Sequence, residues 1–422
     1  MEYVAALDLG TSKMLAVAAS KNNRQEILAS EKVDLDNGIR RGLIYNPEKA
    51  SVKLSALINE FNFKLKPKLK KIYVGIGGQS LHTKAYSVRK EVNGEIENET
   101  INALLNECLN YPVAPLELIE IVSPEYYLDG HLELNPEGVK CNTIEAKFQL
   151  VLGRSSVKSD LEQLIKKTGI EIAEFFVSPI ATAEAVLTNK EKDLGCALIE
   201  FGAGVTYLSI YKGGLLRYLV TIPLGGNAIT KDICDLNITE QEAEELKIKE
   251  GNVLVENEED ELNQIIEARV DEIIANILEQ MKASGYEPTL GAGLIITGGG
   301  SLLKNLDALL EQKTGKPVRT VEENPTQSCA FGLLKLGKEN CAKEEIIIQQ
   351  SQSGVLFDDT SIDKEKIKAE KFKREEEEKR RKKEKEEEKR KKKEGKDGTS
   401  LIQRGLTKFA GILFEDDNTD QK

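Results

Sequence analysis

The sequence predicts an α/β protein with two related halves. Two turns about one domain apart share a pattern, in which an apolar run leads to an acid, an apolar residue, a glycine and then hydroxyl residues (residues 7–13 and 199–206). A third segment, residues 293–303, has a buried-strand pattern that ends in three glycines. Any one of these turns is weak evidence alone, but the repeat together with the third segment favours a duplicated fold.

Each repeated turn is predicted to close a tight β-hairpin, because a second apolar run follows at residues 14–19 and 207–211. The glycine lets the backbone approach a ligand, and exposed turn amides suit a phosphate. The acids Asp8 and Glu200 suit a hydrated Mg²⁺. The hairpins therefore predict a nucleotide clamped between the two halves. The candidate ligands in the hairpins are Asp8, Gly10, Thr11, Ser12, Lys13, Glu200, Gly202, Gly204 and Thr206.

The third segment adds a strand-to-helix turn to the predicted site. A strand is expected at residues 294–296, followed by Gly298, Gly299 and Gly300 and by an apolar helix that begins near Leu302. Backbone without side chains allows close approach of a base, a ribose or an α-phosphate. The alternative is a tight turn with no ligand. No GxxxxGK[ST] loop occurs in the sequence, which excludes a P-loop enzyme.

Composition limits the classes of function. The chain has 422 residues, of which 40% are hydrophobic, enough for several domains with cores. Its six cysteines lack a CxxC pair and no signal peptide is evident, so reduced cytosolic thiols are expected. Two histidines disfavour a multi-histidine metal site or a Ser-His-Asp hydrolase. A net charge of −12 argues against nucleic-acid binding, and no apolar run approaches the ~20 residues of a membrane span.

The three turns, in this order, resemble the actin-like ATPase superfamily. Further segments resemble the FtsA family of bacterial cell-division actins within it. Residues 178–187 and 324–333 resemble that family's two connecting helices, and residues 222–230 resemble the segment that places Gly225 and Gly226 at the phosphates. In residues 242–249, Glu244 and Lys247 match the family's adenosine contacts. The resemblance implies a two-lobed actin-like ATPase fold of duplicated ribonuclease H-like domains, which binds ATP with Mg²⁺ held through water by Asp8 and Glu200.

The resemblance also implies a division of the chain into parts. The first lobe would comprise residues 1–81 and 170–192, and the core of the second lobe residues 193–230 and 292–343. The other expected parts are a small inserted α+β subdomain (82–169), a helical subdomain on the adenosine side (231–291), a linker with a charged spacer (344–398) and a C-terminal amphipathic helix (399–414).

Residues 82–169 interrupt the pattern of the two halves. Short strands at 85–88 and 143–152 and helices at 100–108 and 158–167 are predicted there, as in a small α+β insertion. The run 124–130 resembles the inserted subdomain of the FtsA family, which mediates polymer contacts and contacts with later division proteins. A decorative insertion without a binding role is the alternative.

Residues 364–397 are almost entirely charged. Glu375 to Glu378 precede basic residues at i,i+4, and Glu386 to Glu388 do the same, which is the favourable orientation in a helix. A single exposed helix is expected, with disorder as the alternative.

The last segment has an amphipathic pattern. It follows a basic run and is too short to span a bilayer, so it predicts an interfacial membrane anchor. A helix that docks on the core or on a partner is the alternative. The position matches the membrane-targeting helix of the FtsA family. The residues on the apolar face are Leu401, Ile402, Leu406, Phe409, Ile412 and Leu413.

The second hairpin departs from the family's pattern, Asp-x-Gly-Gly-Gly-Thr-Thr-Asp. Glu200 stands for the first Asp, Ala203 for the middle Gly, Val205 for the first Thr and Tyr207 for the last Asp. Because Glu200 is one C–C bond longer and ~1 Å of misplacement can cost about 10²-fold, it is a weak catalytic candidate. Slow hydrolysis or none is expected.

Two further functions compete with that of a division protein. An ATP-dependent small-molecule kinase of the same fold needs an additional catalytic acid, and a pilus-assembly relative would bind ATP beneath a membrane complex. The FtsA resemblance implies other partners, namely FtsZ, further copies of the chain, later membrane proteins of the division machinery and anionic lipid. It also implies a peripheral location at the septum, on the cytoplasmic face of the inner membrane.

Overall fold

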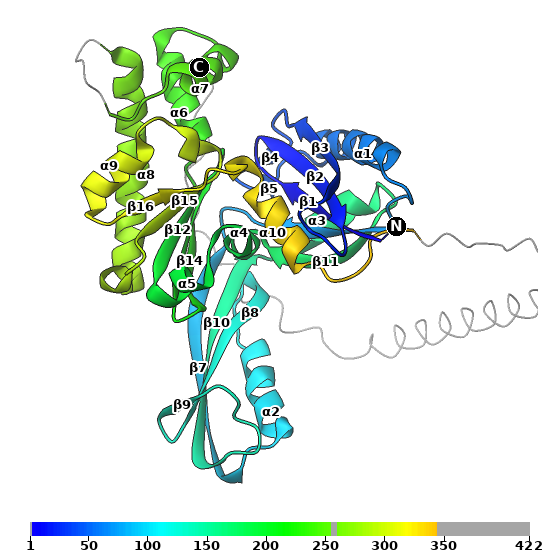
Figure 1. The fold of residues 1–422 in the computed structure, drawn as a ribbon, viewed down its shortest axis with the longest axis vertical. Helices are drawn as coiled ribbons and strands as arrows, with labels where there is room; N and C mark the ends of the chain where they lie inside the picture. Colours follow the sequence, from blue (N-terminus) through cyan, green and yellow to red (C-terminus); the bar gives the residue numbers. More distant parts are fainter. Residues whose placement is uncertain (1, 255–259, 344–422) are drawn as a thin grey trace, which may run out of the picture. The chain divides into compact units, whose positions relative to one another are not determined.

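The computed structural model describes residues 2–254 and 260–343. The predicted spacer (344–398) and the predicted amphipathic helix (399–414) lie outside these residues. The described part contains one sheet of five strands and one of nine, together with a two-stranded ribbon of β4 (Ile39–Arg40) and β5 (Leu43–Ile44) (Figure 1). None of the described helices is both long and apolar enough to cross a membrane.

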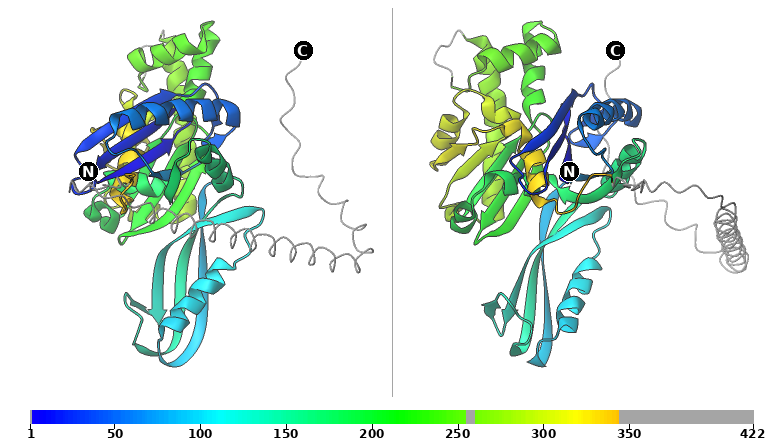
Figure 2. Two further views of the ribbon diagram at one scale, coloured as in Figure 1. Left: turned by 90° about the vertical axis from the view of Figure 1, so that its right-hand side faces the viewer. Right: turned by 45° about the vertical axis from the view of Figure 1, so that its right-hand side comes forward.

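The five-stranded sheet forms the first lobe, in the order β11-β6-β1-β2-β3. Strands β1 and β2 are the first predicted hairpin, and Asp8 pairs with Leu15 across it. Most residues of both strands are buried, because α1 and α10 lie on opposite faces of the sheet (Figure 2). The elements are β1 Tyr3–Leu9, β2 Lys13–Ser20, β3 Ile27–Asp34, β6 Lys71–Ile76, β11 Glu171–Val177, α1 Pro47–Lys64 and α10 Ser328–Leu336.

The nine-stranded sheet runs from the second lobe into the insertion. Its order is β16-β15-β12-β13-β14-β7-β10-β8-β9, and β12 and β13 are the second predicted hairpin. The second-lobe strands are β12 Cys196–Phe201, β13 Thr206–Lys212, β14 Leu215–Ile222, β15 Leu294–Thr297 and β16 Val318–Thr320. The insertion adds β7 His82–Glu95, β8 Leu116–Leu128, β9 His131–Glu133 and β10 Lys140–Arg154.

The junction between β14 and β7 is narrow but specific. The two strands pair at Val220 and His82. Thr83 Oγ1 accepts a 2.8 Å hydrogen bond from the Leu219 amide. Arg217 on β14 forms an ion pair with Glu125 on β8, and both side chains are largely buried. The insertion is therefore attached by its strands to the second lobe.

Two helices of the predicted insertion have different positions. Helix α2 (Asn98–Leu109) packs on β7 and covers one face of the long strands (Figure 1). Helix α3 (Val157–Lys166) contacts α1 and β11 instead, and Leu164 and Ile165 belong to the core of the first lobe. The segment 82–169 thus includes a helix that packs with the first lobe.

Helices cover the second lobe, and two more join the lobes. Helices α6, α7 and α8 pack together, and α8 also contacts β14. The predicted connecting helices are α4 and α10, which pack so closely that a Cβ on Gly332 would lie 1.7 Å from the Ala181 carbonyl oxygen. The helix bounds are α4 Ser178–Val186, α5 Asn189–Leu194, α6 Gly226–Ile233, α7 Glu240–Glu250, α8 Glu261–Ser284 and α9 Leu306–Thr314. All six cysteines are described and are free thiols, as expected.

Candidate functional site

The turns of the two predicted hairpins touch each other. A Cβ built on Gly204 would lie 2.6 Å from Thr11 Oγ1, so the second turn packs directly against the first. Thr11 Oγ1 also accepts a 3.0 Å hydrogen bond from the Gly42 amide. In this arrangement no phosphate fits between Thr11 and Gly204. The structure brings the two turns together as the sequence predicts, but in direct contact.

Two carboxylates lie behind these turns. Burial raises the pKa of Asp8, although the Cys329 thiol and Lys13 oppose the shift. Burial and then the charge of Asp8 raise the pKa of Glu200 to about 8. The Thr182 hydroxyl, which lies beside this carboxylate, opposes the shift in the pKa of Glu200, and neither Glu200 Oε2 nor the Thr182 hydroxyl has a hydrogen bond of ordinary geometry within the described part of the chain. Two neighbouring carboxylates that raise each other's energy when both are charged fit a hydrated divalent cation, whose positive charge would offset their repulsion.

The other predicted residues of the hairpins differ in availability. Ser12 is exposed. Burial lowers the pKa of Lys13, and Asp8 is the main opposing influence. Thr206 is fully buried, and its hydroxyl donates to the Leu224 carbonyl (2.9 Å). The Thr206 hydroxyl therefore supports the backbone, Ser12 is open to a ligand, and Lys13 is partly buried beside Asp8.

Gly225 and Gly226 lie at the start of α6, beside the second hairpin. The Gly226 amide donates to the Gly202 carbonyl (3.0 Å) and the Asn227 amide to that of Ala203 (2.8 Å). A Cβ on Gly225 would lie 2.5 Å from the Gly202 carbonyl oxygen. The two glycines thus allow the helix to pack closely against the second turn.

Glu244 and Lys247, on α7, lie close to the same helix start. The Lys247 ammonium is buried and donates to the Gly226 carbonyl (3.1 Å), to Thr230 Oγ1 (2.8 Å) and to Glu244 (2.5 Å). The Glu244 side chain is 43% exposed. Lys247 therefore ties α7 to α6, and Glu244 is the member of this pair that can reach a ligand.

The segment after the glycine turn differs from the prediction. The predicted helix near Leu302 is wrong: residues Gly299–Leu302 form a 3₁₀ turn, and α9 begins only at Leu306. Gly298 has a φ of +90°, and a Cβ on Gly300 would meet the Phe201 ring at 2.4 Å. Gly298 and Gly300 thus pack closely on Phe201 of β12, an approach that a side chain at either position would block. A Cβ on Gly299 meets nothing within 4 Å, so this glycine faces open space.

A contact that the sequence did not predict joins the lobes behind the turns. The Gly78 amide, after β6, donates a 2.7 Å hydrogen bond to the Tyr207 hydroxyl on β13. Thr221 Oγ1 donates to the carbonyls of Gly78 (3.1 Å) and Leu81 (2.8 Å). Burial strongly raises the pKa of Tyr207, so its hydroxyl stays protonated. The only sequence signal was that a tyrosine stands where the family has an acid.

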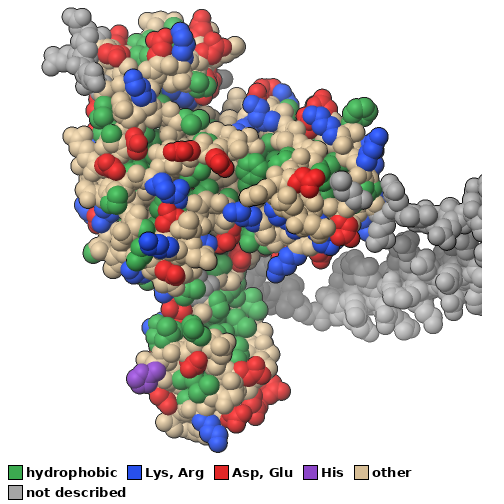
Figure 3. Space-filling model, in the orientation of Figure 1, with side chains coloured by type: hydrophobic (Ala, Val, Ile, Leu, Met, Phe, Trp, Pro, Cys, Tyr) green, Lys and Arg blue, Asp and Glu red, His purple; other side chains and the backbone are tan. Residues whose placement is uncertain are grey.

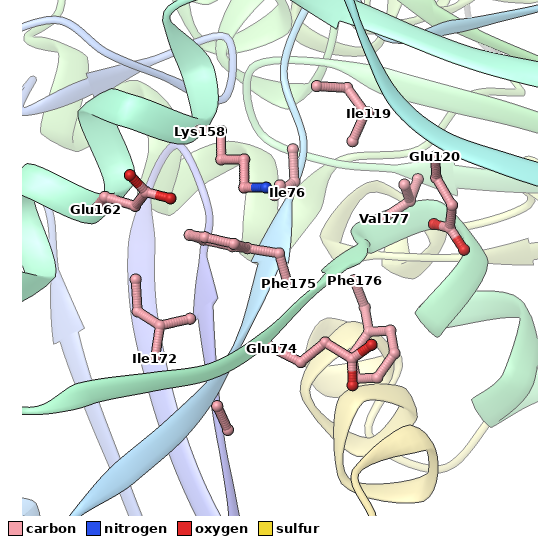
Figure 4. Close-up of a pocket in the computed structure, with 11 residues that line it drawn as sticks. Ile76, Ile119, Glu120, Lys158, Glu162, Ile172, Glu174, Phe175, Phe176 and Val177 are labelled. Carbon is pink, nitrogen blue, oxygen red and sulfur yellow. The ribbon is translucent and has the colours of Figure 1, made fainter. Parts of the chain in front are cut away.

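A cavity of about 540 Å³ lies apart from these residues, between α3, β8 and β11 (Figure 4). Apolar side chains, including Ile76, Ile119 and Phe175, line its interior together with Glu120 and Lys158. Burial, and to a lesser degree Glu174, raise the pKa of Glu120. No residue of the predicted nucleotide site lines this cavity.

Comparisons with known proteins agree with the fold and with the resemblance. A family model described as "Cell division protein FtsA" matches residues 197–332. The chain is 32% identical over 339 residues to cell division protein FtsA of Porphyromonas gingivalis, covering 74% of this chain and 71% of that relative.

Two solved structures share the fold. One is described as the PilM-PilN type IV pilus biogenesis complex, with a TM-score of 0.57, 19% identity, and coverage of 80% of this chain and 98% of that chain. The other is MreB 5 of Spiroplasma citri bound to AMPPNP, with a TM-score of 0.51, 14% identity, and coverage of 80% and 96%. These likenesses confirm the predicted actin-like fold.

Proposed function

Because the chain belongs to the FtsA family of cell-division proteins, we propose that it binds ATP between its lobes and anchors FtsZ filaments to the membrane at the septum. Family membership favours this function over a small-molecule kinase or a pilus-assembly protein. The observation that carries the nucleotide part is that the turns of the two acid-glycine hairpins meet and bring the carboxylates of Asp8 and Glu200 close enough to repel each other.

In this proposal the nucleotide phosphates contact the two turns, and the adenosine lies between the glycine turn and α7. A Cβ on Gly299 meets nothing within 4 Å, and the Glu244 side chain is 43% exposed, so both positions are accessible to a nucleotide. Asp8 and Glu200 would hold Mg²⁺ through water, and the ion would supply positive charge beside the phosphates. The solved MreB 5 structure of the same fold has AMPPNP bound, which supports a nucleotide in this fold.

Nucleotide binding would also change the contact between the lobes. Thr11 lies against Gly204, so phosphates can enter between the turns only when this contact opens. The hydrogen bond from the Gly226 amide to the Gly202 carbonyl joins the second turn to α6, and β14, the strand before α6, pairs with β7 of the insertion. Opening at Thr11 would therefore shift a strand that holds the insertion, the part proposed to contact other copies and later division proteins.

The membrane part of the proposal depends on residues 399–414. Their apolar face would lie in the interface of an anionic membrane, with Phe409 and Leu413 four residues apart on that face. The charged spacer before it would separate the anchor from the lobes. FtsZ filaments would then follow this protein to the cytoplasmic face of the membrane.

The test is co-sedimentation with anionic liposomes. Phe409→Glu places a charge on the apolar face and should release the protein from liposomes, while ATP binding measured by calorimetry stays unchanged. Thr407→Glu adds the same charge outside that face and serves as the matched control, which should still pellet. FtsZ should pellet with the wild type and with Thr407→Glu, but not with Phe409→Glu. If Phe409→Glu still pellets, the anchor assignment is wrong.

A further inference from the structure

A short segment of the first lobe is strongly basic in an otherwise acidic chain. Residues 64–71 contain five lysines and no acid, although the whole chain has a net charge of −12. Leu65 and Leu69 in this segment are 2% and 4% exposed, whereas Lys66, Lys68 and Lys70 are exposed. The alternation turns the leucines into the core and the lysines to the solvent.

Hydrogen bonds fix this segment to both ends of the described chain. The Tyr3 hydroxyl donates to the Pro67 carbonyl (2.9 Å). The Leu69 amide donates to Asn62 Oδ1 (2.8 Å), at the end of α1. The Lys343 amide donates to the Lys68 carbonyl (2.7 Å). The lysines are therefore presented on a firmly held backbone.

An exposed aromatic residue lies within this basic group. Phe63, in the last turn of α1, is 81% exposed, and the Lys68 ammonium lies 5.9 Å from the centre of its ring. We call Phe63, Lys66, Lys68, Lys70 and Lys343 the lysine–Phe63 surface. An exposed aromatic ring in a lysine-rich segment is the combination that favours the interface of an anionic bilayer.

Most of this positive charge is not neutralised by the protein. Lys64 pairs with Glu31 and Lys71 with Glu339. Lys66, Lys70 and Lys343 have no carboxylate partner among the residues that the structure describes, and the Lys68 ammonium donates to the Asn62 carbonyl (2.7 Å). By contrast, both signs of charge are interspersed over the face of the lobes in Figure 3.

We propose that the lysine–Phe63 surface binds anionic lipid headgroups directly, as a second membrane contact of this protein. The inference rests on the proposed membrane function. The described chain ends at Lys343, which is itself part of this surface, and the segment predicted to enter the membrane comes later in the chain. The tail would keep the protein tethered to the membrane, and the positive charge and exposed ring of the lysine–Phe63 surface complement the phosphates of an anionic bilayer.

The chain contains no tryptophan, so a single introduced one reports on its own surroundings. In the full chain, Phe63→Trp should shift its emission to the blue on anionic vesicles and be quenched by brominated lipid in them. Ile248→Trp is the matched control, because Ile248 is a 75% exposed apolar residue on α7, outside this surface. Its emission should not change.

A charge variant tests the same surface by affinity. Lys66→Gln with Lys70→Gln should weaken binding to anionic vesicles by about fivefold for each lysine, roughly 30-fold together, since each contributes about 1 kcal/mol near such a surface. Lys190→Gln with Lys282→Gln removes two exposed lysines elsewhere and should not weaken it. The difference should shrink at high salt.

The outcomes separate this inference from the membrane function itself. If no variant and no wild-type protein binds vesicles, both proposals fail. If the Phe63→Trp protein binds vesicles but is no more quenched than Ile248→Trp, only the lysine–Phe63 surface fails. If the emission of Phe63→Trp is not quenched on vesicles but changes when single-stranded nucleic acid or polyglutamate is added, the lysine–Phe63 surface binds a soluble polyanion and the lipid proposal is wrong.

Discussion

The hydroxyl of Tyr207 in the second lobe accepts a 2.7 Å hydrogen bond from the backbone amide of Gly78 in the first. A Cβ on Gly77 would lie 2.4 Å from the same hydroxyl, so the loop after β6 fits closely around it. The bond lies beside Asp8 and Glu200, whose charges both raise the pKa of Tyr207 after the larger effect of burial. The residue that replaces the family's acid therefore joins the two lobes next to the proposed nucleotide site.

Removal of the Tyr207 hydroxyl should destabilise the fold. Tyr207→Phe leaves the buried Gly78 amide without its acceptor, at a cost of about 1–3 kcal/mol. The free energy of unfolding in urea measures this loss. Tyr45→Phe is the control, because Tyr45 is 61% exposed, and should change the free energy by less than about 0.5 kcal/mol. Equal stability of Tyr207→Phe and the wild type would show that the contact contributes nothing.

Two neighbouring glycines should give opposite results. Gly299→Val places its side chain in open space, so the melting temperature should stay at the wild-type value while ATP binding, measured by calorimetry, is lost. Gly300→Val drives its Cβ to within 2.4 Å of the Phe201 ring and should lower the melting temperature. ATP binding by Gly299→Val at wild-type affinity would exclude the glycine turn from the site.

The raised pKa of Glu200 predicts a pH dependence of stability. Its folded pKa is about 8 against an ordinary 4.5, so the folded state keeps a proton that the unfolded chain loses above about pH 4.5. The contribution of Glu200 to the free energy of unfolding is therefore full below pH 4.5 and falls as the pH rises to about 8. Each unit by which the folded pKa exceeds the unfolded pKa corresponds to about 1.4 kcal/mol of this contribution.

The Gln side chain of Glu200→Gln does not titrate, so this variant serves as the reference. Between pH 5 and pH 8, urea unfolding should show a larger loss of stability for the wild type than for Glu200→Gln. Asp8 titrates in both proteins, so its effect largely cancels in the comparison. Parallel pH profiles of the two proteins would show that Glu200 titrates normally.

The same carboxyl should limit any ATP hydrolysis. The Glu200 side chain is one carbon longer than the Asp of the family's pattern, so it holds a hydrated Mg²⁺ in a position less suited to hydrolysis. Glu200→Asp should therefore raise the basal ATPase rate above that of the wild type, measured as phosphate release. Glu184→Asp shortens a partly exposed acid on α4 and should leave the rate unchanged. An ATPase rate lower in Glu200→Asp than in the wild type would show that the longer Glu side chain positions the carboxylate better for hydrolysis.

The sequence by itself determined the elements whose signals are local. A run of apolar residues, an acid and a glycine specify each hairpin within about a dozen positions, and the structure has both, at β1–β2 and β12–β13. The connecting helices, α4 and α10, and helix α7 were expected from the resemblance to the FtsA family, and the structure has helices at these positions. The start of α9 was not, and Gly300 just before it packs closely on Phe201, about a hundred residues away in the chain, a contact that the local sequence does not indicate.

Only the tertiary structure decided how these elements meet. Pairing of Val220 with His82 makes one sheet of the second lobe and the insertion, and packing of α3 on α1 assigns that helix to the first lobe. The contacts Thr11–Gly204 and Tyr207–Gly78 join residues more than a hundred positions apart. Sequence periodicity reports which face of an element is buried, but the partner on that face is set by the packing of the whole chain.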